Sequence, residues 1–322
     1  MNYSTHIIEK VKEEFRNNLF NKNNMMYERT QQIYKMIPDI KKIDDELSAF
    51  GLQLTKTVMQ GKNSVRALEK MQRETLKLNV KKFELLSKNG YPPDFLEIKY
   101  DCDVCKDEGI VEGKRCSCFT ERLKVEAFKA ANLPVLMDSQ SFDTFNLEFY
   151  PDDDGTPSSR KIMTYVLKIC SDYSKGFGKD SKNLLFTGGT GLGKTFLSSC
   201  IAKDVINAGF NVYYQPSYKI FPLFEQTRFS QQPDENLKMQ IDFIKNSDLL
   251  IIDDLGTELV TTYTAEVLFD LVNTRLNENK KTIISTNLSL DEIRELYSER
   301  VSSRIAGNYL VLKFAGNDIR LI

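Results

Sequence analysis

The carboxyl-terminal half of the chain alternates short apolar runs with longer segments of helical periodicity. The apolar runs predict five strands, at Asn183–Thr187, Asn211–Gln215, Asp248–Asp253, Thr282–Thr286 and Tyr309–Phe314. Between the third and fourth runs, apolar residues recur on one helical face, at Ala265, Leu268, Phe269, Val272 and Leu276. Because strands that alternate with helices form parallel sheets covered on both faces, we predict an α/β domain with a five-stranded parallel sheet over residues 161–322.

The front of the chain shows a different pattern. From Thr5 to about Leu86 it is rich in Lys, Glu, Gln, Leu and Met, contains one proline, Pro38, and predicts several helices. The sequence Asn89-Gly90-Tyr91-Pro92-Pro93 ends the last helix, because glycine suits a C-cap and proline cannot continue a helix. The resulting prediction is a helical region 1–98, a cysteine-bearing segment with a short helix 99–131, a linker 132–160, and the α/β domain.

Length and charge set broad limits. A chain of 322 residues with 41% hydrophobic and 28% charged residues is typical of a globular protein with two or three domains. Residues 1–100 carry 18 Lys and Arg against 13 Asp and Glu, which does not establish a nucleic-acid partner. Neither a membrane span nor a signal peptide is evident, so we expect a cytoplasmic protein without a membrane partner.

A glycine-rich loop lies between the first predicted strand and a helix-prone run from Phe196. It reads Gly188-Gly189-Thr190-Gly191-Leu192-Gly193-Lys194-Thr195. In such a P-loop the glycines let backbone N–H groups surround phosphate oxygens, the lysine reaches the β- and γ-phosphates, and the Thr hydroxyl binds Mg²⁺. The loop predicts binding of ATP and Mg²⁺.

Two later strands end in polar residues at the edge of the sheet where the phosphates would lie. The run Leu249–Ile252 leads into Asp253, which we expect to help hold Mg²⁺, and Asp254, which we expect to act as a general base on the attacking water. The run Ile283–Thr286 leads into Asn287, a candidate to orient that water. Together with the P-loop, these residues predict ATP hydrolysis.

Three arginines near the carboxyl terminus are candidates to stabilise charge on the transferring phosphoryl group. Arg300 and Arg304 are four residues apart and share one face of a predicted helix, and either one fits an arginine finger supplied to a neighbouring subunit. Arg320 follows the last strand.

Four cysteines lie in a short, turn-rich segment. Cys102-x-x-Cys105 and Cys116-x-Cys118 together supply the thiolates that a tetrahedral structural Zn²⁺ site requires. A disulfide pair is the weaker alternative in a reducing compartment. Cys170 and Cys200 have apolar surroundings and are expected to be ordinary buried thiols.

This series of motifs resembles the AAA+ ATPases of the DnaC/DnaI helicase-loader group. By that resemblance, Lys194 and Thr195 belong to Walker A, Asp253 and Asp254 to Walker B, and Asn287 is sensor 1. Arg304 resembles the trans-acting finger, with Arg300 as its competitor, and Arg320 resembles sensor 2. The chain ends two residues after Arg320, so we expect no helical lid and nucleotide closure by a neighbouring copy.

The resemblance extends to the front of the chain. Gly90–Leu96, leading into Tyr100-Asp101-Cys102, is similar to the zinc-containing amino-terminal domain of DnaI-type loaders, and in loaders this domain engages the replicative DNA helicase. The resemblance therefore implies an ATP-dependent loader that deposits the helicase on single-stranded DNA and self-associates through its AAA+ domains. Aromatic and basic residues of the kind that bind single-stranded DNA lie in the second predicted strand and in the segment after it, at Tyr213, Tyr214, Tyr218, Lys219, Phe221 and Phe224, although such aromatics are more often core residues.

Two alternatives remain. One is a transposition or phage-replication helper that shares the ATPase half. Transposition helpers of the IstB type usually lack such cysteines, which disfavours that role, whereas the cysteines say nothing about a phage origin. A zinc-dependent adaptor would bind nucleotide without turning it over, which the Asp253-Asp254 pair and the arginines disfavour.

Overall fold

The computed structural model describes residues 3–59, 65–133, 140–153, 155–230 and 234–321, with the backbone alone for 53–59 and 65–70. Its contacts divide the chain into two compact units: unit 1 is Met1–Glu9 with Thr120–Ile322, and unit 2 is Lys10–Phe119. The division between Phe119 and Thr120 does not coincide with the predicted boundaries after residues 98, 131 and 160. The cysteine-bearing segment shares unit 2 with the helical region, and most of the short helix after it belongs to unit 1. Residues 134–139 and 154 of the predicted linker lie outside the described residues.

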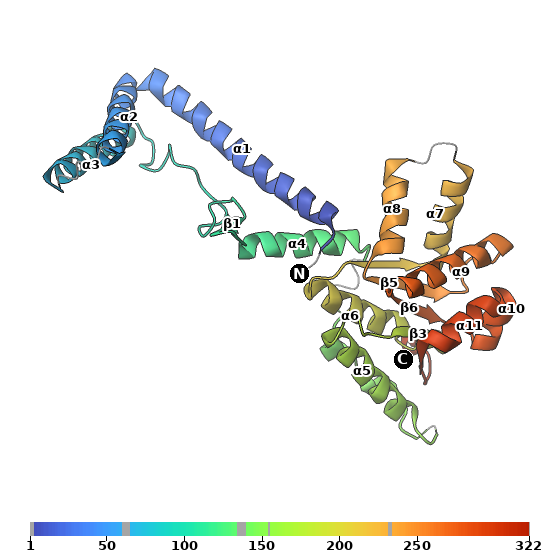
Figure 1. The fold of residues 1–322 in the computed structure, drawn as a ribbon. Coiled ribbons are helices and arrows are strands. Elements are labelled where there is room, and N and C mark those ends of the chain that lie inside the picture. Colours follow the sequence, from blue (N-terminus) through green and yellow to red (C-terminus); the bar gives the residue numbers. More distant parts are fainter. Residues whose placement is uncertain (1–2, 60–64, 134–139, 154, 231–233, 322) are drawn as a thin grey trace. The chain divides into compact units, whose positions relative to one another are not determined.

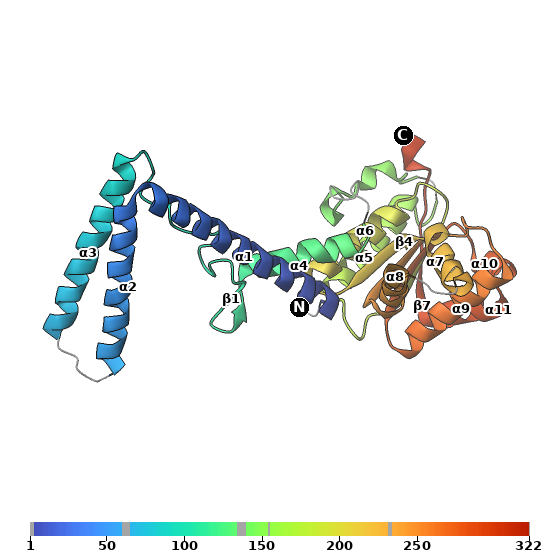
Figure 2. The same cartoon turned by 90° about the horizontal axis from the view of Figure 1, so that it is seen from above.

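Unit 2 is helical, as predicted. Its elements are α1 (Thr5–Met36), which begins in unit 1, α2 (Pro38–Met59), α3 (Val65–Lys88), β1 (Ile110–Val111) and β2 (Lys114–Arg115). Pro38 is the first residue of α2, where its missing N–H leaves no hydrogen bond unmade. Helices α2 and α3 lie side by side (Figure 2). A small apolar core of Ile33, Ile37, Ile40 and Leu86 joins α1, α2 and α3.

Unit 1 contains the predicted five-stranded parallel sheet, in the order β4-β5-β6-β3-β7. The strands are β3 (Asn183–Thr187), β4 (Val212–Pro216), β5 (Leu249–Leu255), β6 (Lys281–Thr286) and β7 (Tyr309–Lys313). The helices are α4 (Ser117–Ala130), α5 (Ser159–Lys175), α6 (Lys194–Asn207), α7 (Ser217–Phe229), α8 (Glu235–Asn246), α9 (Thr262–Asn277), α10 (Leu290–Leu296) and α11 (Glu299–Asn308). Where the chain is described, 3₁₀ turns occur at Phe142–Thr144, Leu147–Phe149 and Ile319–Leu321.

Helices cover both faces of the sheet (Figure 1). Helices α5 and α6 lie on one face, and α7, α8, α9 and α11 lie on the other. The larger core packs side chains such as Leu185, Leu250 and Ile284 of the strands against Leu268 and Ile305 of the helices. The residues before α1 are fastened to this unit, since the Tyr3 hydroxyl donates to the Ile206 carbonyl at 2.9 Å. The predicted α/β fold class is therefore confirmed.

Several side chains singled out from the sequence are core residues. Cys170 and Cys200 are buried, and so are Tyr213, Tyr214 and Phe221. Tyr218 is exposed at the start of α7. Within the described residues, no helix has the length and apolar character needed to cross a membrane.

Candidate functional site

The P-loop connects β3 to α6 through a path that requires glycine. Gly188, Gly191 and Gly193 have φ of 140°, 67° and 87°, conformations that residues with a Cβ rarely adopt. A Cβ on Gly188 would lie 2.6 Å from the Phe314 carbonyl oxygen, and one on Gly193 would lie 2.9 Å from the Tyr150 hydroxyl. The loop is therefore held between Phe314, the residue after β7, and the segment that precedes α5.

Lys194 is the first residue of α6, and its side chain folds back over the loop. Its ammonium donates to the carbonyls of Gly188 and Gly189 at 2.7 and 2.6 Å and to Oδ1 of Asn287 at 2.7 Å. Burial lowers the pKa of Lys194, and the nearby carboxylates of Asp254 and Asp253 oppose that shift. The structure thus brings Asn287, which follows β6, onto the P-loop lysine.

Asp253 is buried at the end of β5, and hydroxyl groups surround its carboxylate. Thr195 donates to Oδ2 at 3.0 Å, Tyr214 of β4 also donates to Oδ2, and Ser285 of β6 donates to Oδ1. Threonine hydroxyl and carboxylate oxygens are ligands that suit Mg²⁺. Thr195 and Asp253 therefore form a pair fit to hold that ion, and Tyr214 and Ser285 fix the orientation of the carboxylate.

Asp254 occupies an irregular position on β5. The pairing of β5 with β6 shifts register between Ile252 and Leu255, and Asp254 has a left-handed φ of 51°. Its N–H donates to the Ser285 hydroxyl at 3.0 Å. Its side chain lines the cavity beside the P-loop. Burial, and then the neighbouring Asp253 carboxylate, raises the pKa of Asp254.

The cavity beside the P-loop has a volume of about 470 Å³. Among the predicted residues it is lined by Thr190–Thr195, Asp254, Asn287 and Arg320. Arg320 is held by the carboxylate of Asp318 through contacts of 3.1 Å from Nε and Nη2. The Ile319 N–H donates to the Gly191 carbonyl at 3.1 Å, so the carboxyl-terminal segment is fastened to the loop.

Two predicted residues lie apart from this cavity. Arg300 and Arg304 are exposed on α11 and do not line it. The structure therefore brings the P-loop, Walker B, sensor 1 and sensor 2 candidates together at one site. Both arginine-finger candidates lie on the exposed surface of α11.

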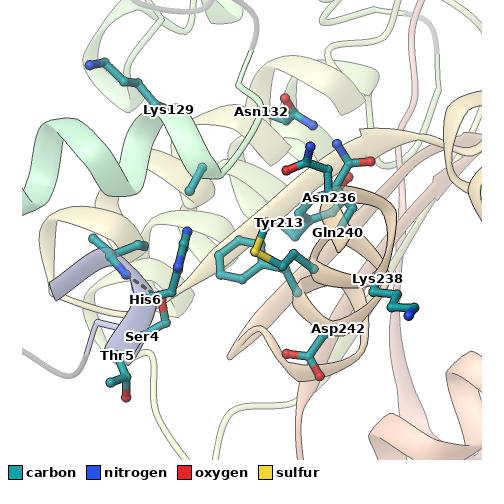
Figure 3. A pocket seen from close by; sticks show the side chains of 14 residues that line it. Ser4, Thr5, His6, Lys129, Asn132, Tyr213, Asn236, Lys238, Gln240 and Asp242 are labelled. Atoms are coloured by element: carbon teal, nitrogen blue, oxygen red, sulfur yellow. Dashed lines mark hydrogen bonds between the residues drawn. The ribbon is translucent and has the colours of Figure 1, made fainter. Parts of the chain in front are cut away.

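A second, larger cavity of about 840 Å³ lies at the β4 edge of unit 1 (Figure 3). It is lined by residues of α8, the end of α4 and the first turn of α1, among them His6, Asn132, Tyr213, Asn236 and Gln240. It contains neither the glycine-rich loop nor the acidic pair. The smaller cavity is therefore the candidate nucleotide site.

The four cysteine sulfurs of unit 2 lie within 4.8 Å of one another. Cys102 and Cys116 are 3.8 Å apart at Sγ, and Cys105 and Cys118 are 3.4 Å apart. A tetrahedral Zn²⁺ with Zn–S bonds of about 2.3 Å separates its sulfurs by about 3.8 Å, so this cluster fits that ion. Backbone N–H groups of Cys105 and Val104 lower the pKa of Cys102 to about 7, whereas burial and the neighbouring thiols raise the pKa of Cys118, so the spacing of the sulfurs carries the assignment to zinc.

Asp107 supports the cysteine cluster. Its buried carboxylate accepts the N–H groups of Asp101 and Cys102 at 3.0 and 2.8 Å and pairs with the Lys22 ammonium of α1 at 2.6 Å. This residue was not predicted from the sequence, and neither were Tyr214 and Ser285 as supports of Asp253. Asp107 joins Cys102 of its own segment to Lys22 of α1, and Tyr214 and Ser285 act on Asp253 from other strands. No motif in the sequence marks these contacts.

The comparisons with known proteins agree with this geometry. The sequence model of the IstB-like ATP binding protein family matches residues 124–306. The chain belongs to this family of ATP-binding proteins.

Among individual proteins, the chain is similar to the replicative helicase loader DnaC of Escherichia coli (strain K12), with 23% identity over 218 residues that span 67% of this chain and 83% of DnaC. It is 27% identical to the replicative helicase loader DnaI of Bacillus subtilis (strain 168) over 163 residues, or 49% of this chain and 50% of DnaI. A crystal structure of the DnaC helicase loader matches 56% of this chain and 100% of that chain, at 23% identity and a TM-score of 0.47. The sequence matches to DnaC and DnaI confirm the resemblance to the DnaC/DnaI group.

Proposed function

We propose that this protein is an ATP-dependent helicase loader of the cytoplasm, which binds the replicative DNA helicase through unit 2 and deposits it on single-stranded DNA. The observation that carries the ATPase part is the convergence of Lys194, Asp254, Asn287 and Arg320 on one cavity, with Thr195 and Asp253 in contact beside it. The loader role is supported by the names of the relatives, DnaC and DnaI.

In the proposed reaction each side chain has one task. Lys194 would bind the β- and γ-phosphates, and Thr195 and Asp253 would hold Mg²⁺, which supplies neutralising charge to the phosphates when bound. Asp254 would accept a proton from the attacking water that Asn287 orients. Its raised pKa favours this role, because a base is most effective when its pKa approaches the working pH. Arg320 would detect the γ-phosphate, and Arg304, or alternatively Arg300, would act on ATP held by a neighbouring copy.

The ATPase proposal is tested by the turnover of Asp254→Asn. We expect the variant to bind a fluorescent ATP analogue as the wild type does and to lose roughly 10²-fold or more in kcat. Equal turnover of the two proteins would refute the assignment of Asp254 as the base. Absence of turnover in the wild type, with normal nucleotide affinity, would favour an adaptor that uses the nucleotide structurally.

An apolar stripe on α3 supports the proposed helicase contact. Leu76, Val80 and Phe83 are exposed by 67%, 48% and 38% and recur at helical spacing, while Leu86 on the adjacent face is buried. Exposed apolar groups arranged in this way are typical of a surface that binds another protein. The cysteine cluster in the same unit is proposed to bind structural Zn²⁺.

Capture of the purified replicative helicase by the full-length chain tests the loader role. The double variant Leu76→Lys with Phe83→Lys is expected to weaken capture by roughly thirtyfold or more, because even a single interface hot spot of this kind costs about 2 kcal/mol. Glu74→Lys, on the side of α3 opposite the stripe, changes the net charge by the same amount and is expected to bind normally. If the wild type captures no helicase, the loader role is wrong and a helper ATPase of the IstB type becomes the better description.

A further inference from the structure

Glu258 closes the turn that follows β5 and collects hydrogen bonds from three parts of unit 1. Its Oε2 accepts the Gly256 N–H at 3.0 Å and the Ser217 hydroxyl of α7 at 2.5 Å. Its Oε1 accepts the hydroxyl of Tyr297, the residue that follows α10. An ionised carboxylate accepts several donors at once, and such charge-assisted bonds are stronger than neutral ones. Glu258 is therefore the common acceptor of the turn, α7 and the α10–α11 connection.

The same turn determines where Asp254 points. The Asp254 carbonyl accepts both the N–H and the hydroxyl of Thr257, at 3.2 and 2.8 Å. The Ser217 hydroxyl lies 2.9 Å from this carbonyl and has one proton to share between it and Glu258. Gly256 has a φ of 101°, so the turn follows a path that glycine permits. The left-handed conformation of Asp254 is thus maintained by a turn that Glu258 holds closed.

The contact with Tyr297 links this turn to the helix that carries the arginines. Tyr297 is buried, and Ser298, the next residue, caps the first turn of α11. Helices α10 and α11 are joined by a hydrogen bond of 3.0 Å from the Ser302 hydroxyl to the Leu290 carbonyl. Hydrogen bonds therefore connect the turn at Glu258 to the helices α10 and α11, and α11 presents Arg300 and Arg304 on its exposed surface.

We propose that Glu258 is a positioning residue that couples the nucleotide cavity to α11 through Tyr297. Nucleotide bound in the cavity beside Asp254 would shift the turn. The hydrogen bond from Tyr297 to the carboxylate of Glu258 would then shift α11, which presents Arg304. This inference rests on the proposed function, since it requires ATP in the cavity. Its physical basis is a contiguous chain of hydrogen bonds between two sites, and coupling through such a chain is measurable.

The test uses the full-length chain and two substitutions. Tyr297→Phe keeps the buried ring and deletes the hydroxyl that reaches Glu258. Glu258→Gln keeps one acceptor oxygen and removes the charge. Glu295→Gln, on the exposed surface of α10, removes the same charge away from the turn and serves as the control. Unfolding midpoints of all the variants show whether they are folded.

Amide hydrogen exchange with and without a slowly hydrolysed ATP analogue and Mg²⁺ measures the coupling. In the wild type and Glu295→Gln, nucleotide is expected to slow exchange both in the P-loop and in residues 297–308. In Tyr297→Phe and Glu258→Gln, the effect is expected to remain in the P-loop and disappear from residues 297–308. The kcat of ATP hydrolysis in both is expected to fall about tenfold, the cost of losing one hydrogen bond to a charged group, with nucleotide affinity changed less than about twofold.

The outcomes separate this inference from the function on which it rests. If the wild type binds nucleotide with a measurable Kd but residues 297–308 do not respond, the coupling is refuted while the proposed ATPase stands. An unchanged response in Tyr297→Phe refutes the role of the hydroxyl contact. A wild type that binds no ATP analogue overturns both, and the binding measurement identifies that case.

Discussion

Gly188→Ala tests whether the P-loop has the geometry described here. Gly188 has a φ of 140°, and a Cβ placed on it would lie 2.6 Å from the Phe314 carbonyl oxygen and 3.1 Å from the Phe314 Cβ. Backbone atoms cannot move aside as the end of a flexible side chain can. Phe314 is also held in place, because its N–H donates to the Thr187 carbonyl at 2.7 Å and its ring packs against Phe186.

Two separate costs contribute to the expected destabilisation. A residue with a Cβ in this region of φ costs about 1–3 kcal/mol, and a forced shift of packed neighbours costs about 1–3 kcal/mol more. We therefore expect Gly188→Ala to lower the free energy of unfolding by about 3 kcal/mol or more. For a unit of about 200 residues, each kcal/mol lowers the Tm by about 2–4 °C, so the expected decrease is roughly 6–12 °C.

Gly189→Ala is the matched control. It makes the same chemical change one residue later, but Gly189 is exposed, its φ is not positive, and its Cβ would meet only the Leu192 Cδ1, at 3.8 Å. Calorimetry of unit 1 unfolding in the full-length chain, together with titration of a fluorescent ATP analogue, compares the two variants. We expect a large decrease in Tm and loss of nucleotide binding for Gly188→Ala and a small change in Tm for Gly189→Ala. Equal Tm values would refute the close contact between the loop and Phe314.

Three further predictions concern metal binding and stability. Cys105→Ser is expected to abolish bound zinc, measured by atomic emission on the purified chain, whereas Cys170→Ala, outside the cluster, should retain it. Arg275→Met is expected to lower unfolding stability by about 3 kcal/mol in denaturant titrations, because it removes the donors to the buried carbonyls at the end of α8 and the start of β6. Asp254→Asn is expected to raise the Tm at neutral pH. The pKa of Asp254 is raised in the folded state, so its carboxyl group favours folding only at pH values below the usual carboxyl range. That favourable contribution is lost as the pH rises through the folded pKa, and the amide of asparagine does not lose it. The gain in Tm should therefore shrink on acidification, and a gain that is constant with pH would contradict this assignment.

Four of the five strands were predictable as short apolar runs that are largely buried, and β7, whose Leu310 and Val311 are exposed, was predictable from its apolar residues alone. The bounds of β3 are those predicted, and β4, β6 and β7 differ from the prediction by one residue at one or both ends. The prediction for β5 ended at Asp253, whereas the strand continues to Leu255. The difference lies at the register shift that accommodates Asp254, and an irregularity of this kind depends on the neighbouring strand rather than on local sequence.

The candidate site was predictable where its chemistry is local in sequence. The P-loop is one continuous segment, and Asp253 and Asn287 follow apolar runs, so the parallel arrangement of the strands alone places them at one edge of the sheet. The groups that orient these residues were not predictable in the same way. The partners of Tyr214, Ser285 and Glu258 lie tens of residues away in the sequence. Tyrosine, serine and glutamate are also common residues, so their presence at these positions does not indicate such a contact.

The hydrogen bonds of Lys194 indicate how nucleotide would change the site. Its three partners are neutral oxygens, two from loop carbonyls and one from the amide of Asn287. A phosphate oxygen forms a stronger, charge-assisted bond with an ammonium group, so bound ATP would displace at least one of these neutral partners. Release of Asn287 would free its amide for the water that attacks the γ-phosphate. The binding of ATP and the positioning of the attacking water are therefore linked through the side chain of Lys194. Lys194→Arg retains the positive charge but not the compact ammonium group, so it should impair the turnover of ATP as well as the affinity for ATP.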